Sequence, residues 1–542
     1  MKKLFIPLAI LLVCAFILVG CTTSSPTTTA PAPKPATPTS APAPTTPAAG
    51  TPQYGGSFIY VRNTGIPNIG APSDTPASTF VRSIVTPVLE SIVGRDKEGR
   101  FQPYLAETAD VTPDGKTLTL KLFRGLKFQD GTDCNAAAIK FNLEKVLAAN
   151  CAASSILKLV SSYDVVDDIT LKINLSKFDA RLLLTLAETG NGQIASPTAL
   201  QKATNPQDVG KDHIVGTGPF KFHSWQTDQF VKLVKWDGYR VKGRPYLDAI
   251  ELRNNSDLTV SLMSFKAGEV NMVENIDPSQ FVSLKKEGYN AAIPPIAFVF
   301  TILFDSASPD SPFKDVRVRQ AVEYAIDKVA MTSGIGLGTQ WPAYQFAASP
   351  PLGQDAWYLP DLPKREYNPA KAKQLLAEAG YPNGFSYPLI SDVRIRQDQV
   401  VAIQTYLKAV GIETKLDMAD VLRASSFGKD GWKGILVPGF PYFSSFTQWL
   451  AVFNDPVMTN PSRYLPPGYR AGWDEVAGEI DYDKRMTKMK ALMKQAVDEA
   501  LHVPYLQDGP RYVDDGRIQG MNWNVPGQNG QFDFENMWLK KK

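Results

Sequence analysis

Cysteine and histidine are scarce in this 542-residue chain, which contains only four cysteines and three histidines. It has no Cys-x2-Cys metal clamp and no pair of histidines spaced for a zinc-binding helix. A Gly-x-Ser-x-Gly nucleophile elbow and a phosphate-binding Gly-x4-Gly-Lys-Ser/Thr loop are also missing. We therefore expect no metal, no cofactor and no catalytic residues. A glycosidase pair drawn from the 54 acidic residues stays open as an alternative.

An excess of charge is absent as well. Beyond residue 53 the chain carries 54 basic and 54 acidic residues. Nucleic-acid-binding domains normally show a basic excess, so we expect no nucleic-acid partner. Only one long apolar run occurs, Leu4 to Val19, and it is too short for an ordinary membrane-spanning helix.

This apolar run has the form of an export signal. Lys2 and Lys3 precede it, and Leu18 to Cys21 close it with a small residue before a cysteine. The ending resembles the lipobox of bacterial lipoproteins, which implies cleavage before Cys21 and a diacylglycerol on its thiol. Residues 1–20 are then a signal peptide. The alternative is an ordinary secretory signal with an accidental cysteine.

Large apolar side chains are missing from the segment that follows Cys21. Thr22 to Gln53 consists almost entirely of Thr, Pro, Ala and Ser, with nine prolines and one charge, Lys34. Such a composition cannot repay the entropy cost of folding. In polyproline II conformation, at about 3.1 Å per residue, it would reach up to roughly 100 Å. We therefore interpret 21–53 as a lipidated cysteine and a disordered tether.

The remaining 489 residues exceed one hydrophobic core, so two or more lobes are expected. Strand and helix patterns alternate, which indicates an α/β fold. The patterns predict a strand at Ser57 to Val61, hairpins at Val111 to Leu122 and Val165 to Leu175, and a helix at Asn135 to Ala149.

That last helix separates Cys134 from Cys151. At 1.5 Å per residue it places them roughly 20 Å apart, too far for a disulfide. We favour two free, buried thiols. A disulfide between these two cysteines is possible only if the chain turns back after Leu147.

The C-terminal half has clear signals for where helices begin and end. Asn368-Pro369 starts a helix that Gly380 ends, and a long amphipathic helix at Tyr482 to Leu501 leads into a strand at Val503 to Gln507. Between them lies a β-α-β unit, made of Ser386 to Ile390, Gln397 to Val410 and Ile412 to Leu416.

Two glycine-rich segments are interpreted as turns. Gly334 to Gly338 follows a helix, not a strand, which favours a flexible turn over a nucleotide-binding loop. Gly216 to Pro219 precedes a predicted strand, Phe220 to Ser224, and is likewise a turn.

Aromatic residues gather between Phe427 and Phe453, where Pro438-Gly439 and Pro441 interrupt regular structure. Aromatic side chains on irregular backbone are suitable walls for a ligand cleft. The alternative is that most of them belong to the core. The predicted ligand-binding aromatic residues are Trp432, Phe440, Tyr442, Phe443 and Trp449.

Several segments, in order along the chain, resemble the extracellular solute-binding proteins of family 5, the oligopeptide, dipeptide and nickel receptors of ABC importers. The segments that carry this resemblance are Thr86–Val93 with Pro103–Glu107, Asp114–Leu120 with Phe123–Gly131, Gly216–Phe220, Phe265–Glu269, Phe313–Ala321 with Ala325–Lys328, and Tyr367–Tyr381.

The resemblance implies an α/β, two-lobed periplasmic-binding-protein-like fold with a cleft, crossing hinge strands and an extra subdomain inserted in lobe one. We expect lobe one at 54–82, 196–295 and 508–542, the inserted subdomain at 83–195, and lobe two at 296–507. The implied function is capture of a small solute and its delivery to ABC permease subunits, by a monomer lipid-anchored to the cell membrane on its extracytoplasmic face. A secreted, lipid-anchored hydrolase is the alternative.

The ligand is less defined by the resemblance. Peptide receptors of the family pair the peptide amine with an aspartate near a Trp-x-x-Asp-Tyr segment, whereas Val437 to Ser445 here contains no acid. This departure favours a sugar, a blocked peptide or another amphipathic solute over a peptide with a free amine. The polar residues predicted to contact the ligand are Asn63, Asp305 and Asp508, the two aspartates being the candidates for charge pairing.

Overall fold

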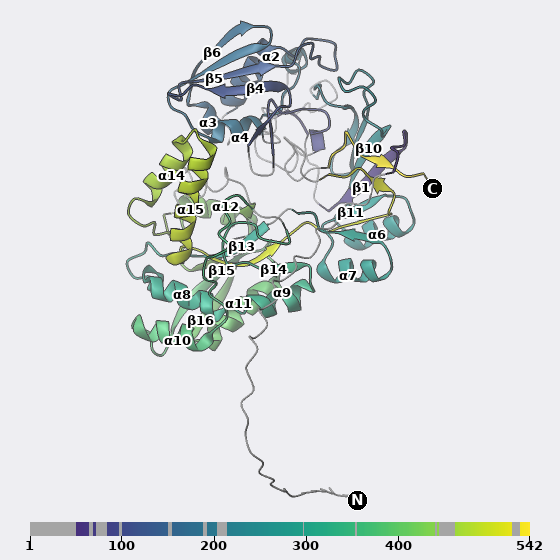
Figure 1. Ribbon diagram of the computed structural model, residues 1–542. Coiled ribbons are helices and arrows are strands. Elements are labelled where there is room, and N and C mark those ends of the chain that lie inside the picture. Colours follow the sequence, from purple (N-terminus) through teal and green to yellow (C-terminus); the bar gives the residue numbers. More distant parts are fainter. Residues whose placement is uncertain are drawn as a thin grey trace, which may run out of the picture. The chain divides into compact units, whose positions relative to one another are not determined.

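The computed structural model describes residues 50–63, 69–71, 84–96, 100–149, 154–187, 192–202, 214–295, 298–352, 355–438, 442–443, 461–522 and 532–541 (Figure 1). The predicted signal peptide and Cys21 lie outside these residues, as does nearly all of the predicted tether. Within the described ranges, no helix combines the length and the apolar character that crossing a membrane requires.

The first large sheet has the strand order β12-β20-β11-β1-β10-β9-β8. β1 runs parallel to β10 and β11, and helices α6 (Leu258–Lys266) and α7 (Pro278–Lys286) follow β10 and β11. The predicted strand at Ser57 is confirmed. The strands are β1 (Ser57–Arg62), β8 (Phe220–Gln226), β9 (Phe230–Lys235), β10 (Ala249–Asn254), β11 (Met272–Glu274), β12 (Asn290–Ala292) and β20 (Tyr512–Asp514).

The second large sheet has the order β14-β19-β13-β17-β15-β16, with β18 paired to β13. The predicted β-α-β unit is confirmed: β15 and β16 are parallel and α11 (Gln397–Ala409) connects them. The predicted strand at Val503 is also present, as β19. The strands are β13 (Phe298–Phe304), β14 (Gln340–Pro342), β15 (Phe385–Asp392), β16 (Ile412–Ala419), β17 (Ile435–Val437), β18 (Tyr442–Phe443) and β19 (Val503–Asp508).

Most helices that accompany this sheet begin at a capping side chain. In α10 the Asn368 side chain accepts a hydrogen bond from the Lys371 amide at 2.9 Å, as the Asn-Pro start predicted. One prediction is wrong in part, because Gly334 and Gly336 lie inside the last turn of α9, and the chain leaves the helix only at Leu337. The helices are α8 (Val316–Ala325), α9 (Lys328–Gly336), α10 (Pro369–Glu378), α12 (Val421–Asp430), α14 (Tyr469–Gly478) and α15 (Tyr482–Asp498), with a short 3-10 helix at Pro312–Lys314.

A separate four-stranded antiparallel sheet, in the order β4-β5-β7-β6, is built from residues 106–175. Both predicted hairpins are present, and the predicted helix after Cys134 is α2, capped by Asn135. Cys134 is free and buried, whereas Cys151 lies outside the described residues. The elements are β4 (Ala106–Val111), β5 (Thr117–Leu122), β6 (Val160–Asp167), β7 (Thr170–Leu175), α2 (Ala136–Ala148), α3 (Ser154–Leu157) and α4 (Arg181–Ala187).

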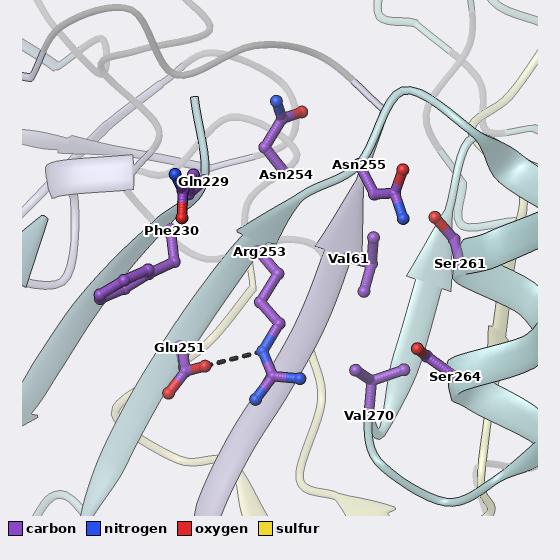
Figure 2. Close-up of a pocket in the computed structure, with 10 residues that line it drawn as sticks. All are labelled: Val61, Gln229, Phe230, Glu251, Arg253, Asn254, Asn255, Ser261, Ser264 and Val270. Carbon is purple, nitrogen blue, oxygen red and sulfur yellow. Dashed lines mark hydrogen bonds and ion pairs between the residues drawn. The ribbon is translucent and has the colours of Figure 1, made fainter. Parts of the chain in front are cut away.

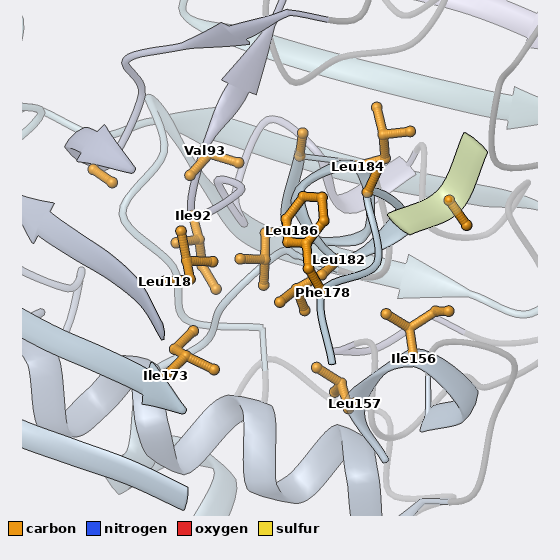
Figure 3. Packing of buried hydrophobic residues seen from close by; sticks show 14 of the residues in the cluster. Ile92, Val93, Leu118, Ile156, Leu157, Ile173, Phe178, Leu182, Leu184 and Leu186 are labelled. Carbon is orange, nitrogen blue, oxygen red and sulfur yellow. The ribbon is translucent and has the colours of Figure 1, made fainter. Parts of the chain in front are cut away.

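The core under this small sheet contains aliphatic side chains from both hairpins and from α4. Figure 3 shows Leu118 of β5 and Ile173 of β7 close to Ile92, Val93 and Leu186. The same hydrophobic cluster includes residues of α14 and α15, among them Trp473 and Met489, which are fully buried. The small sheet therefore packs with a helix pair that is more than 290 residues away in the sequence.

The chain passes between the two large sheets twice. Residues 293–297 connect β12 to β13, and residues 509–511 connect β19 back to β20. Each large sheet has its own hydrophobic core: Phe58, Leu252 and Met272 lie in the first, and Ile302, Leu389 and Ile435 in the second. The two crossings are thus short links between separately packed sheets.

Candidate ligand-binding site

The carboxyl ends of β1, β10 and β11 lie at one edge of the first sheet because these strands are parallel. In open α/β sheets, ligands bind beyond such an edge. Asn63 follows β1 there, and its side-chain oxygen accepts a hydrogen bond from the Asn275 amide at 3.3 Å. Both side chains are exposed. The structure therefore places the predicted residue Asn63 at a suitable edge, next to a second amide.

Asn275 was missed by the sequence analysis. It follows β11 with a φ of 58°, in the left-handed region that asparagine tolerates better than most residues. The signal was present in Asn275-Ile-Asp-Pro278, where a strand ends and Asp277-Pro278 starts α7. Its proximity to Asn63, 212 positions away, comes from the pairing of β1 with β11 and has no local signature.

Asp508 lies at the carboxyl end of β19, opposite Phe298 of β13. Its carboxylate accepts hydrogen bonds from the Gln340 side chain at 2.7 Å and from the Gly509 amide at 2.8 Å, and it forms an ion pair with Arg511. Asp508 is 8% exposed. Its oxygens are therefore already engaged by groups of the chain itself.

Arg511 joins the two large sheets. One guanidinium nitrogen bonds to Asp508, and Nε donates to the Ile276 carbonyl, between β11 and α7, at 2.6 Å. Sequence analysis did not select Arg511, because its two partners come from different sheets. Its contacts identify it as a brace across the second crossing.

Arg396 is a further charged residue at this edge of the second sheet, exposed just before α11. It donates to the Asp398 carboxylate at 3.2 and 2.6 Å. That hydrogen bond, with the charges of Asp398, Asp277 and Asp508, raises the pKa of the Arg396 guanidinium against the opposing effect of desolvation. Because Asp277 precedes α7 of the first sheet, charges from both sheets meet around Arg396.

Asp305, the other predicted aspartate, lies at the opposite edge of the second sheet. It follows β13, and β13 runs antiparallel to β19, so about seven residues of strand, roughly 23 Å, separate it from the level of Asp508. Tyr387 and Ser311 donate to its carboxylate at 2.7 and 2.9 Å, and burial raises the pKa of Asp305. The two aspartates therefore do not meet in one site.

Among the predicted aromatic residues, Trp432 is 7% exposed and packs with Phe427 and Leu436. Its indole nitrogen donates to the Gly434 carbonyl at 3.2 Å, so it serves the core in this structure. Tyr442 and Phe443 form β18, whose backbone pairs with β13 beside Asp508. Their side chains, with Phe440 and Trp449, lie outside the described residues, and their contact with ligand stays a prediction.

A groove of about 310 Å³ lies over strands β1, β9 and β10 and helix α6, next to the sheet edge that carries Asn63 and Asn275 (Figure 2). Arg253 lies in its middle and donates to Glu251 at 2.7 Å. Sequence analysis missed this groove, because its walls come from four separate segments. It is lined by Val61, Gln229, Phe230, Glu251, Arg253, Asn254, Asn255, Ser261, Ser264 and Val270.

Metal binding has no support in the described part of the chain, where no three His, Cys, Asp or Glu side chains lie close enough together to hold an ion. The donors and acceptors at the two carboxyl edges are amides and paired charges. This arrangement can hydrogen-bond a ligand.

Comparison with known proteins identifies the family. Residues 100–468 match the family described as bacterial extracellular solute-binding proteins, family 5, middle region. The chain belongs to this family. The members of this family are described as extracellular solute-binding proteins, and the alternative of a hydrolase has no support from the relatives.

One family 5 relative is the glutathione-binding protein GsiB of Escherichia coli (strain K12), which is 32% identical over 349 residues. The match covers 63% of this chain and 66% of that protein, just under two thirds.

Solved structures of family 5 type show the same fold. AgaA from A. tumefaciens R10, in complex with agropinic acid, matches with a TM-score of 0.70 and 24% identity over 90% of this chain and 99% of that one. NikA from Brucella suis, in complex with Fe(III)-EDTA, matches with a TM-score of 0.76 and 21% identity over 90% and 100%. The expected α/β, periplasmic-binding-protein-like fold is confirmed.

Proposed function

We propose that this family 5 protein is the substrate-binding component of an ABC importer, which captures a small solute between two lobes and delivers it to permease subunits. The family match over residues 100–468 carries the proposal. The two short crossings between separately packed sheets support it, since a few residues at such links can absorb a hinge motion. We propose that it acts as a monomer.

We propose the same division into lobes that the sequence predicted: 54–82, 196–295 and 508–542 for lobe one, 83–195 for its inserted subdomain, and 296–507 for lobe two. The first large sheet would form the center of lobe one, and the second that of lobe two. The Arg511 brace would then lie at the hinge.

For the solute we propose a peptide-like or other amphipathic molecule without a free amine as its main anchor. Asn63 and Asn275 offer exposed amides, whereas Asp508 is already paired with Arg511. Since Val437 to Ser445 contains no acid, no aspartate in that segment could receive a peptide amine. Glutathione, which GsiB binds by its name, tests the opposite case, because its γ-glutamyl residue carries a free α-amine.

A thermal-shift screen tests the proposal. The probes are glutathione, di- to pentapeptides with free and acetylated amines, and neutral disaccharides. A ligand at 100 times its Kd should add about 2.7 kcal/mol to the free energy of unfolding. If only peptides with free amines stabilise the protein, the proposed solute class is wrong.

A matched pair of variants ties binding to the proposed edge. Asn63→Ala should weaken the stabilisation by the best probe, because it removes an exposed amide of the site. Asn383→Ala removes another exposed amide, in the loop before β15, and should leave binding unchanged. Mass spectrometry of the same probe after incubation should recover it intact; turnover would revive the hydrolase alternative.

We further propose that a lipid on Cys21 holds the protein at the extracytoplasmic face of the cell membrane. A tether keeps the local concentration of receptor near its permease high. Cys21→Ser should move the protein from the membrane fraction to the soluble fraction, as measured by fractionation. Retention in membranes of this variant with residues 1–20 removed would contradict the anchor.

A further inference from the structure

The helix pair α14–α15 forms an arm that connects the second large sheet to the small four-stranded sheet. At the base of the arm, Arg365 and Gln320 donate to the Asp498 carbonyl, each at 2.9 Å, and Arg319 donates to the Glu499 carbonyl. These contacts fix the carboxyl end of α15 to the region of α8. With 17 residues, α15 extends about 25 Å from this base.

The tip of the arm contacts the small sheet through backbone and apolar groups. The Ala180 amide, before α4, donates to the Ala477 carbonyl of α14 at 2.7 Å, and both residues are buried. The Arg100 guanidinium lies 4.7 Å from the center of the Tyr482 ring, close enough for a cation–π contact.

The hairpin turn between β4 and β5 fits closely against this tip. Gly115, with a φ of 67°, approaches so near that a methyl group there would lie 2.8 Å from Cβ of Phe178 and 3.6 Å from Cδ1 of Ile480. Ile480 lies between α14 and α15 and is partly buried. Beside this contact is a groove of about 410 Å³, lined by residues of the turn, of 177–179 and of α14.

We propose that this contact is a closure latch, in which Ile480, Tyr482 and Ala477 of the arm hold the inserted subdomain when the two lobes are closed on a solute. The proposal rests on the proposed function. By chain connectivity the small sheet precedes the first crossing at 293–297, whereas the arm lies between the two crossings. The latch is thus a non-covalent link between the proposed lobes, in addition to the two chain crossings and the Arg511 brace, and opening of the hinge must break it.

Two features suit a reversible contact. Among the described residues one backbone hydrogen bond crosses it, together with apolar packing that includes buried side chains of α14 such as Trp473 and Val476, whereas the base of the arm has several hydrogen bonds from charged side chains. Exposed charged groups line the adjacent groove, namely Asp114, Lys116, Lys177 and Asp474, so water has access when the contact separates. Because ligand is bound only by the competent closed state, the latch sets the apparent affinity through the population of that state.

Hydrogen exchange of the full chain without ligand tests the latch directly, because the Ala180 amide bonds across it. Ile480→Ala should speed exchange at Ala180 about fivefold, while amides of β5 such as Leu120 keep their protection. The matched control is Leu422→Ala, which truncates a side chain that is 85% exposed on α12 and should change neither amide. Small-angle scattering should show a larger radius of gyration for Ile480→Ala than for the control.

The proposal is overturned if Ala180 exchanges equally fast in both variants. It is also overturned if Ile480→Ala speeds exchange throughout β4–β7, because the contact would then belong to the permanent core of the subdomain. In a second measurement, the affinity for glutathione should fall in Ile480→Ala by a factor similar to the change in exchange rate at Ala180. Failure of glutathione to bind the wild type would count against that solute, while the exchange experiment still decides the latch.

Discussion

Two aspartates, six residues apart, flank the second crossing, and their carboxylates have different bonding partners in the two sheets. Asp508 ends β19 of the second sheet and is paired with the Arg511 guanidinium. Asp514 ends β20 of the first sheet, and its donors among the described residues are neutral: the Gly516 amide and the Asn290 side chain, both at 2.8 Å. Both are buried, at 8% and 3% exposure.

The difference shows that burial alone does not determine the behaviour of a carboxyl group here. Desolvation raises the pKa of Asp514 to about 6, and the neutral hydrogen bonds lower it only in part, while the charge of Asp515 raises it further. Asp508 instead has a cation that also bonds the first sheet through the Ile276 carbonyl. An ionic anchor thus connects the sheets, whereas a neutral one serves within a sheet.

Removing the cation should have the largest effect. Arg511→Ala leaves the buried Asp508 without its charge partner and removes the hydrogen bond to Ile276. We expect a loss of about 3–5 kcal/mol in the free energy of unfolding, measured by urea denaturation. Arg511→Lys keeps the charge and should lose less; equal losses would show that the guanidinium geometry, not the charge, carries the stability.

Asp514, whose donors are neutral, should make the free energy of unfolding depend on pH. The folded-state pKa of Asp514, about 6, exceeds the unfolded value of about 3.9, so between them the folded protein holds a proton that the unfolded chain has released. Stability from this group is therefore full below pH 4 and is lost as the pH rises through 6, by roughly 1–3 kcal/mol.

Asp514→Asn should flatten this slope, as seen in melting temperatures between pH 4 and 8. An unchanged slope would mean that Asp514 does not hold the proton. The comparison with Asp508 would then lose its electrostatic basis.

The sequence predicted this region unevenly, for a physical reason. Local signals gave α10, through Asn368-Pro369 and Gly380, and the β15-α11-β16 unit, because caps and periodicity depend on neighbouring residues. They could not separate Asp305 from Asp508, since the edge on which each one lies depends on strand direction in the assembled sheet.

Long-range pairing hides the other site residues in the same way. Asn63 was predicted, but its partner Asn275 lies 212 residues away. Arg511 was not predicted, because its bonding partners belong to the two different sheets. Trp432 shows the opposite failure: an aromatic residue in a suggestive segment is core, because its indole nitrogen and its ring both find partners within the second sheet's surroundings.

Removing the neutral donor of Asp514 should have a moderate effect. Asn290→Ala deletes one hydrogen bond to a carboxyl group that has no cation, and should cost about 1 kcal/mol at pH 7. It should also raise the pKa of Asp514 further, moving the midpoint of the pH dependence upward. A loss of stability without such a shift would assign the effect to packing of the Asn290 side chain.

The matched change on the other aspartate should have the smallest effect. Gln340→Met removes an amide that donates to Asp508 at 2.7 Å while nearly keeping the side-chain volume. Asp508 retains Arg511 and the Gly509 amide, and the buried Oε1 of Gln340, which has no hydrogen-bond donor, disappears with the substitution. We expect a change within about 0.5 kcal/mol by urea denaturation. If Gln340→Met instead costs as much as Asn290→Ala, the guanidinium does not protect Asp508 from loss of a neutral donor, and the two anchors differ less than their partners indicate.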